Sequence, residues 1–494
     1  MTPRHVEVLI IGAGLSGIGM ACQLIREQTG RSFAIIERRD NVGGTWDLFK
    51  YPGIRSDSDM LSFGFGFRPW IGTKTLADGP SIRNYIEDTA REYGVVEHIH
   101  FARRGIRASY DSTSALWTVE VLNERTSETE IWTANFLVGA TGYYDYDQGY
   151  QPDFAGSEDF TGQIVHPQHW PEDLDYKNKK VVVIGSGATA ITLVPAMAEQ
   201  VAHITMVQRS PTYIQALPSQ DPAAIAMKMA RVPDKIAYKI GRARNIALQR
   251  ASFGLSRTNP QLAKKILLNQ IKLWVGNTID MKHFTPSYNP WDQRLCVVPD
   301  GDLFKVLKSG QADIVTDRIA RFTETGVLLE SGQQLEADII ITATGLNVQI
   351  AGGAELVVDG VPVNTREAAL YKGVMLSAVP NAVIILGYTN ASWTLKADLA
   401  ALYFCRVLNT MREGRFEQFS VRAGAEDIAA TSVMGDSLTS GYITRGDGVM
   451  PRQGVRAPWK IVNNYYRDRA ILAKDDLRDG ILRFDRVSAP AVKR

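Results

Sequence analysis

A glycine-rich motif near the start of the sequence has the spacing of a nucleotide-binding turn. It reads Gly12-Ala13-Gly14-Leu15-Ser16-Gly17, and the next strand-like run ends at Glu37. Such a turn brings a pyrophosphate to the N–H groups of a helix N-terminus, and an acid at the end of the next strand accepts hydrogen bonds from ribose hydroxyls. A carboxylate there disfavours a 2′-phosphate. Gly12, Gly14, Gly17 and Glu37 therefore predict a site for a dinucleotide without that phosphate.

A second motif, Gly185-Ser186-Gly187-Ala188-Thr189-Ala190, is followed by a run that ends in Gln208-Arg209-Ser210. Alanine is tolerated at the third glycine position, and a guanidinium in place of the acid matches the oxygens of a 2′-phosphate. We therefore expect NADP(H) to bind here. The predicted contacts are Gly185, Gly187, Ala188, Thr189, Arg209 and Ser210. Two alternatives stay open, in which Arg209 is a solvated side chain at a helix start and Ser210 is only a helix cap.

Two dinucleotide sites of opposite charge preference indicate transfer of a hydride between two cofactors. FAD in the first site and NADPH in the second fit that pattern. Disulfide reductases share the layout, but they need a closely spaced redox cysteine pair, and Cys22, Cys296 and Cys405 are far apart in the sequence. The histidines show no metal-ligand spacing, so we predict no metal site.

The elements that position these motifs are short apolar runs typical of buried parallel strands. Residues 8–11 and 181–184 lead into the two glycine turns, and two further runs end in Ala-Thr-Gly at residues 140–142 and 343–345, where we expect the chain to cross between domains. The predicted fold is α/β, with two Rossmann-like dinucleotide-binding domains and a helical insertion. The predicted limits are 1–145 with 340–494 for the FAD domain, 146–215 with 283–339 for the NADP domain, and 216–282 for the insertion.

The insertion is strongly basic. Residues 221–282 contain twelve lysines and arginines against three aspartates, a net charge of +9 in a chain of net charge +2. Three interpretations remain open: a solvated helical face, a wall or lid of the substrate pocket, and peripheral attachment to anionic lipid. Nucleic acid is excluded as a partner because no recognition module accompanies the charge.

The bulk composition is that of an ordinary soluble globular protein. The 494 residues are 45% hydrophobic and 22% charged, which predicts two to four domains and requires no polyanionic partner. Because neither a signal-peptide pattern nor a membrane-length apolar stretch is present, we expect a cytoplasmic protein, with contact at the membrane only through the insertion.

Between the two Rossmann motifs lies a segment with a family-specific pattern. Residues 160–171 read FTGQIVHPQHWP and place Phe160, Gly162, His166, Trp170 and Pro171 in the FxGxxxHxxxWP fingerprint of type I Baeyer–Villiger monooxygenases. A second family pattern is formed by Gly43-Gly44, Trp46, Tyr51-Pro52-Gly53 and Asp57. The sequence resembles this family over nearly its whole length. Residues 44–49, 166–176 and 387–394, and the short stretch before the first strand, look most like the mycobacterial branch that activates ethionamide.

The resemblance implies an activity and a catalytic pair. Such enzymes use FAD, NADPH and O2 to form a C4a-peroxyflavin, which inserts one oxygen atom beside a ketone carbonyl to give an ester or lactone and also oxidises sulfides or thioamides. The resemblance identifies Arg294 as the residue that stabilises negative charge and Asp57 as the carboxylate that positions it, with Asp59 as a rival. The alternative for Arg294 is a surface arginine paired with Asp292.

The resemblance also implies further cofactor contacts. Gly44, Thr45, Trp46 and Asp57 are expected to bind the cofactor, with Trp46 either beside the flavin ring or a plain core residue. Asn390 and Trp393 are expected in the loop that closes the flavin pocket. His166 is expected to link the domains rather than to act as a base. Two other functions stay open: a flavin-containing N- or S-monooxygenase without ketone activity, and a membrane-associated flavoprotein that responds to NADPH.

Overall fold

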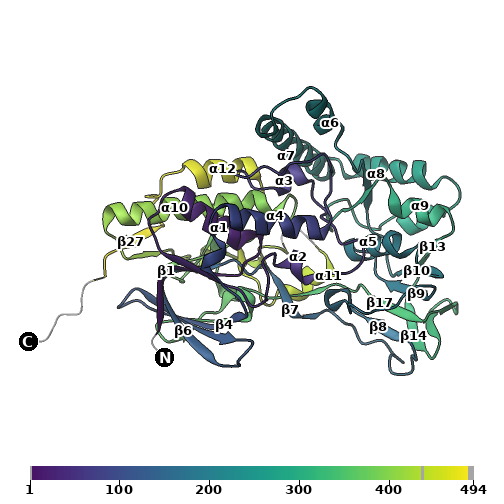
Figure 1. Cartoon of the computed structure of the whole chain (residues 1–494), viewed down its shortest axis with the longest axis horizontal. Helices are drawn as coiled ribbons and strands as arrows, with labels where there is room; N and C mark the ends of the chain where they lie inside the picture. Colours follow the sequence, from purple (N-terminus) through teal and green to yellow (C-terminus); the bar gives the residue numbers. More distant parts are fainter. Residues whose placement is uncertain (1–2, 436–438, 488–494) are drawn as a thin grey trace, which may run out of the picture.

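The fold is built around two sheets, each with a glycine motif at the carboxyl end of a central strand. The computed structural model describes residues 3–435 and 439–487. In Figure 1, the sheet that contains β1 (Arg4–Ile11) lies in one half of the molecule and the sheet that contains β9 (Lys180–Ile184) in the other. The predicted α/β fold with two Rossmann-like units is confirmed.

The first sheet has nine strands in the order β20-β19-β4-β5-β6-β1-β2-β3, with β23 paired to β6. The pairs of β1 with β2 and β6 are parallel, whereas β4, β5 and β6 form an antiparallel meander. The remaining bounds are β2 (Phe33–Ile36), β3 (Ile99–His100), β4 (Arg103–Asp111), β5 (Leu116–Asn123), β6 (Thr129–Gly139), β19 (Glu355–Val358), β20 (Val361–Pro362) and β23 (Ala382–Ile384).

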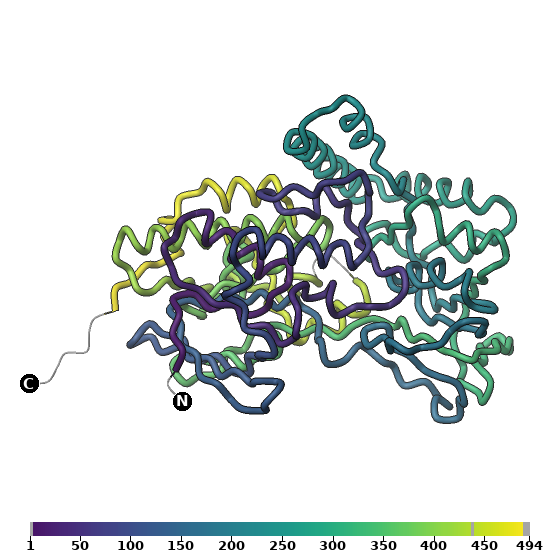
Figure 2. The backbone as a smooth tube through the Cα atoms, viewed as in Figure 1, coloured from purple at the N-terminus to yellow at the C-terminus, as the bar shows by residue number. Residues whose placement is uncertain are grey.

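Helices from both ends of the chain cover this sheet. The helix α1 (Leu15–Arg26) packs against α10 (Trp393–Gly414), and α4 (Gly79–Glu92) and α12 (Tyr465–Lys474) pack beside this pair. Figure 2 shows the purple N-terminal and green to yellow C-terminal segments running together in this half. The first sheet is therefore completed by residues that follow the second sheet in sequence.

The second sheet is entirely parallel, with the order β13-β10-β9-β17-β8. Its strands are β8 (Gln163–Val165), β9, β10 (His203–Gln208), β13 (Ala312–Thr316) and β17 (Ile339–Thr342), and its helices are α5 (Ala188–Met197) and α9 (Asp302–Lys308). The expected domain boundary between residues 339 and 340 falls inside β17, so the second sheet extends to Thr342. The strands are buried on both faces, which explains their continuous Val and Ile runs.

A two-stranded ribbon joins the two halves. The strands β7 (Tyr144–Gly149) and β18 (Leu346–Val348) follow the two Ala-Thr-Gly runs and pair antiparallel with each other. Smaller elements complete the fold: α2 (Thr45–Leu48), α3 (Met60–Phe63), α11 (Gly441–Gly446), β14 (Ile319–Thr323), β15 (Gly326–Leu329), β16 (Gln334–Glu336), β21 (Leu370–Tyr371), β22 (Met375–Leu376), β24 (Gln418–Ser420), β25 (Ile428–Ser432), β26 (Arg452–Gly454) and β27 (Arg483–Asp485).

The basic segment forms three helices beyond the second sheet. They are α6 (Pro222–Met229), α7 (Asp234–Thr258) and α8 (Pro260–Val275); α6 and α7 stand at the top of Figure 1, and α8 lies lower, to their right. The strands β11 (Ile214–Leu217) and β12 (Cys296–Pro299) pair with each other at their base. None of the helices in the described ranges is long and apolar enough to cross a bilayer.

Candidate functional site

The first glycine motif forms a tight turn between β1 and α1. Gly12 has φ +106°, and a Cβ there would lie 2.8 Å from the Ala140 carbonyl oxygen. A Cβ on Gly17 would lie 1.9 Å from the Gly12 carbonyl oxygen. Both positions require glycine because the helix start packs directly against backbone. Gly14 is the N-cap of α1, so the N–H groups of the first helical turn point toward the space beyond the sheet.

Glu37 lies where the sequence predicts it, directly after β2, and it is buried with 4% of its surface exposed. Its carboxylate accepts hydrogen bonds from the backbone N–H groups of Ala13, at 2.7 Å, and Arg39, at 2.9 Å. Burial raises the pKa of Glu37, and the two backbone bonds oppose that shift. The side chain thus braces the glycine turn and also lines the cavity described below.

The second glycine motif repeats this geometry at the end of β9. Gly185 has φ +139°, and a Cβ there would lie 2.3 Å from the Ala343 carbonyl oxygen. A Cβ on Gly187, the N-cap of α5, would meet nothing within 4 Å, so this side of the turn is open. Ser186 donates a hydrogen bond to the Ser210 carbonyl oxygen at 3.1 Å. The exposed Arg209 has no ion-pair partner in the described part of the chain, which leaves it available to a phosphate.

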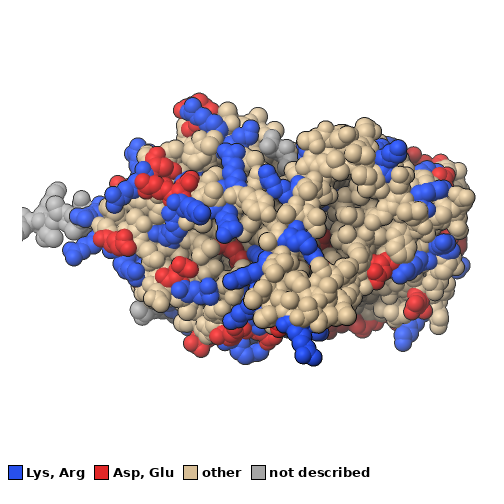
Figure 3. Space-filling model, turned by 90° about the horizontal axis from the view of Figure 1, so that it is seen from above, with Lys and Arg blue, Asp and Glu red and all other residues tan. Residues whose placement is uncertain are grey.

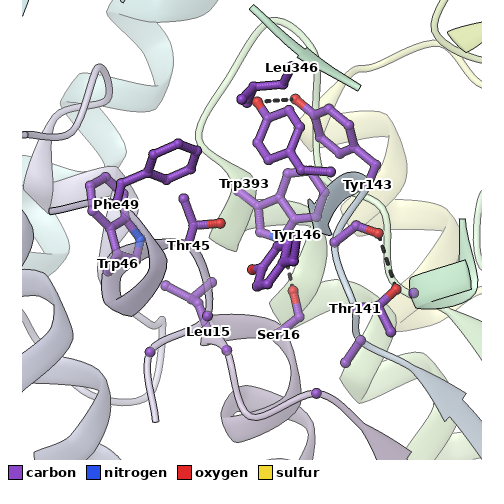
Figure 4. Close-up of a pocket in the computed structure, with 18 of the residues that line it drawn as sticks. Leu15, Ser16, Thr45, Trp46, Phe49, Thr141, Tyr143, Tyr146, Leu346 and Trp393 are labelled. Carbon is purple, nitrogen blue, oxygen red and sulfur yellow. Dashed lines mark hydrogen bonds between the residues drawn. The ribbon is translucent and has the colours of Figure 1, made fainter. Parts of the chain in front are cut away.

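One cavity of about 320 Å³ brings the two motifs together. Gly12, Gly14 and Glu37 of the first motif line it, as do Ala188 and Thr189 of the second. Figure 4 shows Trp46 and Phe49 on one side of this cavity and Tyr143 and Trp393 on the other. A concave, largely apolar space with a few polar groups is typical of a cofactor or ligand site.

Arg294 and Asp57 meet in the wall of this cavity. Arg294 Nη1 lies 3.5 Å from Asp57 Oδ2, and Nη2 lies 3.4 Å from the Tyr143 hydroxyl oxygen. The Arg294 side chain is 31% exposed and lines the cavity. Tyr143 raises the pKa of Arg294 further above its ordinary value, burial opposes this shift, and Tyr442 and Asp57 add to it. The guanidinium is therefore a permanent cation.

Asp292, the alternative partner of Arg294, is engaged elsewhere. Its carboxylate pairs with Arg257 of α7 at 3.1 Å. Arg294 also keeps a buried Nε without a hydrogen-bond partner among the described residues. A buried donor without a partner is uncommon in proteins, and the side chain that carries this one lines the cavity.

Asp59, the rival of Asp57, has a structural task. It is buried and caps α3, accepting a hydrogen bond from the Ser62 N–H at 2.9 Å. It also accepts hydrogen bonds from the side-chain amides of Asn245, at 2.6 Å, and Gln249, at 2.5 Å, both on α7. The two aspartates are therefore distinguished by geometry: Asp57 faces the cavity and Asp59 ties α3 to α7.

The predicted segment Gly44-Thr45-Trp46 reaches the cavity at the N-terminus of α2. All three residues line it, and the Trp46 ring packs edge-on against Phe63 with a centroid distance of 5.7 Å. Asn390 is placed differently. Its side-chain Nδ2 donates to the Asn463 carbonyl oxygen at 3.1 Å, whereas Ala391 and Trp393 from the same loop line the cavity. A cofactor contact by Asn390 stays a prediction.

Two tyrosines of the site were missed by the sequence reasoning. The hydroxyls of Tyr143 and Tyr144 are 3.0 Å apart, and the Trp393 ring stacks on Tyr143 with a centroid distance of 5.5 Å. The Trp393 Nε1–H donates to the Ser16 hydroxyl at 2.8 Å, as Figure 4 shows. Burial raises the pKa of Tyr144 to about 12, so its hydroxyl stays protonated. The available signal was their place directly after the first Ala-Thr-Gly run.

His166 joins the ribbon to the second sheet and does not line the cavity. Its Nδ1 accepts from the Gln168 N–H at 3.2 Å, so Nε2 carries the proton that bonds to the Gly345 carbonyl oxygen at 3.1 Å. Burial lowers the pKa of His166, and the nearby His169 adds to that shift. A neutral histidine held between two backbone groups fits the expected linker better than a base.

The cavity residues fit a flavin dinucleotide. Two glycines of the turn, Gly12 and Gly14, line one space together with the start of α1, the buried Glu37 and the Arg294 side chain. No cluster of His, Cys, Asp or Glu suited to a metal ion occurs within residues 3–435 and 439–487. The three cysteines are buried and free.

Comparison with known proteins places the chain in a family. Residues 76–414 match the model of flavin-binding monooxygenase-like proteins, and residues 10–71 match that of an NAD(P)-binding Rossmann-like domain. A probable FAD-binding monooxygenase, AlmA, of Acinetobacter baylyi is 54% identical over 485 residues, which cover 98% of this chain and 97% of that protein. The FAD-containing monooxygenase EthA of Mycobacterium tuberculosis is 48% identical over 490 residues, which cover 99% of each chain.

Solved structures show the same fold at lower identity. An oxidized steroid monooxygenase bound to NADP has a TM-score of 0.79 and 21% identity, with 98% of this chain and 100% of that one covered. Cyclohexanone monooxygenase from Rhodococcus sp. Phi1 bound to NADP⁺ has a TM-score of 0.77 and 22% identity, with the same coverage. The predicted resemblance and the predicted use of FAD and NADP agree with these names. The chain belongs to the flavin-binding monooxygenase-like family.

Proposed function

We propose that this protein uses FAD and NADPH to insert one atom of O2 beside the carbonyl of a small ketone, giving an ester or lactone. The observation that supports this proposal is the Arg294–Asp57 pair, which lies in the same cavity as both glycine motifs. Oxidation of sulfides or thioamides by the same site is part of the proposal. A peroxide oxygen can add as a nucleophile to a carbonyl carbon, and in its protonated form it can accept the lone pair of a soft sulfur atom.

The two motifs divide the binding of the cofactors. Residues of the first half would hold FAD, and those of the second would hold NADPH, whose 2′-phosphate would pair with Arg209 and Ser210. The proposed FAD contacts are Gly12, Gly14, Gly17, Glu37, Gly44, Thr45, Trp46, Asp57 and Asn390; those for NADPH are Gly185, Gly187, Ala188, Thr189, Arg209 and Ser210. When bound, the flavin takes electrons from NADPH and supplies them to dioxygen.

Arg294 would act as a fixed positive charge. Negative charge develops on the carbonyl oxygen when an oxygen nucleophile adds to a ketone, and a preorganised cation stabilises that charge without reorganising water. Asp57 Oδ2, at 3.5 Å, would hold one nitrogen of the guanidinium. The Tyr143 hydroxyl would hold the second nitrogen, Nη2, at 3.4 Å, so the guanidinium would keep one orientation in the cavity wall.

The aromatic wall would keep water out. Trp46, Phe63, Tyr143 and Trp393 surround the cavity, and the Trp393–Ser16 hydrogen bond fixes one side of it against α1. Exclusion of water strengthens the field of Arg294 and protects an activated oxygen species from hydrolysis and loss. The apolar lining of the cavity favours a hydrophobic ketone over a charged acceptor.

A product analysis tests the function. Purified protein with FAD, NADPH and oxygen is incubated with phenylacetone, with a long-chain 2-ketone and with a thioether. An ester from either ketone supports the proposal, whereas sulfoxide without any ester assigns the protein to the N- and S-oxygenating enzymes. NADPH oxidation that yields only hydrogen peroxide contradicts both. The expected peripheral contact with a membrane is separate from this function, because it depends on the outer surface of the insertion.

A further inference from the structure

The long helix α7 has its polar side turned inward. Tyr238 and Arg242 donate hydrogen bonds to backbone carbonyl oxygens near α3, Tyr238 to Phe65 at 2.9 Å and Arg242 to Ser62 at 3.0 Å. Asn245 and Gln249 continue the same stripe and bond to Asp59. An ordinary surface helix packs an apolar stripe against the core and leaves its polar side in water. In α7 a polar stripe contacts the protein, beside the buried Ile246.

The opposite side of α7 is apolar and exposed. Ile236 and Ile240 are 50% and 54% exposed, and Ala243 and Ala247 continue this stripe at helical spacing. Leu248, 60% exposed, widens it. No partner within the described chain covers these side chains, so α7 is amphipathic with the apolar side outward.

The neighbouring helix α8 exposes a second apolar stripe. Leu262, Ile266 and Leu273 are 43%, 51% and 86% exposed and share one side of the helix. A separate stripe of α8 provides its contacts with the protein, formed by the buried Ala263, Leu267, Ile271 and Val275. On α6, Met229 is 80% exposed.

The exposed hydrophobic side chains of the protein are concentrated on the insertion. Eight of the sixteen large hydrophobic side chains that are exposed in residues 3–435 and 439–487 lie on α6, α7 and α8. We call them the outer face of the insertion: Ile225, Met229, Ile236, Ile240, Leu248, Leu262, Ile266 and Leu273. Single exposed hydrophobic residues are normal, but a concentration on three packed helices marks an interaction surface.

Unpaired cations accompany the outer face. Within the described residues, eight lysines and arginines of these helices and their connections have no carboxylate partner: Lys228, Arg231, Lys235, Lys239, Arg250, Lys264, Lys265 and Lys272. Lys235, Lys239 and Arg250 flank the stripe of α7, and Lys265 and Lys272 flank that of α8. Figure 3 looks onto the molecule from above, and the half that carries the insertion shows mainly tan surface with scattered blue.

We propose that the outer face of the insertion docks onto an anionic phospholipid bilayer. Apolar side chains on helices that lie flat enter the boundary between headgroups and acyl chains, while the flanking lysines and arginines pair with lipid phosphates. The positive charge selects this occupant over a second copy of the chain, because two copies of the same face would bring like charges together. The hydrogen bonds from α7 to α3 hold the docked helices rigidly on the rest of the protein.

Flotation with lipid vesicles tests the proposal without any use of the oxygenase activity. The full-length holoprotein is mixed with vesicles of phosphatidylcholine alone, or of equal parts phosphatidylcholine and phosphatidylglycerol. It should float with the anionic vesicles and lose most of that binding at high salt, because salt screens the cation–phosphate attraction. It should bind the neutral vesicles weakly.

A pair of double variants identifies the surface. Ile240→Glu with Leu273→Glu should lower partitioning onto anionic vesicles at least about tenfold, because two inserted side chains become anionic. The matched control, Val361→Glu with Val455→Glu, changes side chains that are 67% and 52% exposed outside the insertion and should leave binding unchanged. Unaltered melting temperatures show that both variants fold.

Three results would overturn the proposal. Wild-type protein that floats with neither kind of vesicle has no such surface, and equal loss in both double variants places the contact elsewhere. A wild-type oligomer that fails to bind vesicles and dissociates in the Ile240→Glu, Leu273→Glu variant, measured by sedimentation, shows that a second copy covers the face.

Discussion

Arg294 Nη1 lies 3.5 Å from Asp57 Oδ2, although 237 residues separate them in sequence. Asp57 belongs to the loop before α3, whereas Arg294 lies just before β12, so the pair forms only when the two halves of the molecule pack together. Both side chains are partly exposed to the cavity, and a pair of this kind contributes little to stability. The pair instead serves to position the Arg294 cation in the cavity where the two glycine motifs meet.

Replacement of Arg294 should impair the oxygenation of the ketone and leave the reduction of the flavin by NADPH intact. Arg294→Ala is expected to reduce ester formation by about 10² to 10³-fold, the usual cost of removing one preorganised charge stabiliser. Reduction of the flavin by NADPH, followed anaerobically by absorbance, should continue near the wild-type rate. Ester formation that survives the change would show that another group stabilises the charge.

The two neighbouring aspartates should respond in opposite ways. Asp59→Ala removes a helix cap and leaves Asn245 and Gln249 without their acceptor, so the free energy of unfolding should fall by about 2 to 4 kcal/mol. Asp57→Ala should change stability by no more than about 0.5 kcal/mol, as at other exposed sites, yet impair oxygenation. Urea unfolding and product yield, measured on both variants, test the distinction; a reversed pattern would exchange the two roles.

Coenzyme preference should depend on Arg209. Because a charge-assisted hydrogen bond contributes about 1.5 to 3 kcal/mol, Arg209→Ala should raise KM for NADPH by one to two orders of magnitude and leave KM for NADH nearly unchanged. Arg257→Ala serves as the control, because it removes a different arginine, one that pairs with Asp292 at the surface. An equal rise in KM for NADPH and NADH in Arg209→Ala would show that Arg209 does not bind the 2′-phosphate.

The glycines of the two motifs should differ in what they tolerate. Gly17→Ala places a Cβ 1.9 Å from a carbonyl oxygen and should cost at least about 3 kcal/mol of stability through overpacking. Gly187→Ala meets no atom within 4 Å and should change stability by only about 1 kcal/mol or less. It should still weaken NADPH binding, because the methyl group occupies the approach to a pyrophosphate. Thermal unfolding and NADPH titration measure the two effects.

The free energy of unfolding should fall at acid pH because His166 becomes protonated. Its pKa is lowered from 6.5 in the folded protein, so between these two pKa values the unfolded chain binds more protons than the folded one. Its stabilising contribution is therefore present above pH 6.5 and is lost as the pH falls through the folded pKa. His166→Gln should lack this part of the pH dependence in urea unfolding. Parallel curves for the two proteins would show that His166 does not titrate in this range.

Much of the fold could be predicted from the sequence because the patterns that specify it are local. Continuous Val and Ile runs that end in glycine turns specify parallel strands, and Glu37 and Arg209 follow their strands at the expected places. Arg294 and Asp57 became candidates only through the family resemblance, since nothing in their local patterns indicates that they meet. The structure then separated Asp57 from Asp59, which are two residues apart but face different surroundings.

Other features depend on packing that a sequence pattern does not specify. Helical periodicity predicted amphipathic helices in the insertion, but it could not say that α7 would turn its polar stripe inward, because α3 presents bare carbonyl oxygens there. Tyr143 and Tyr144 have no catalytic pattern of their own and gain importance only from their contact with Arg294 and each other. The domain boundary expected between residues 339 and 340 lies within β17, which runs on to Thr342 before the chain turns.

The return of the chain to its first sheet has a consequence for biosynthesis. The strand β23 and the helix α10, which cover β6 and α1, lie beyond residue 380, after the whole second sheet. During translation, the apolar side of α1 therefore stays without its partner helix α10 while more than three hundred residues are added. The second sheet, contiguous apart from its insertion, can close first. A chain truncated before α10 would therefore have a folded second sheet and an incomplete first sheet with exposed apolar surface, which favours aggregation.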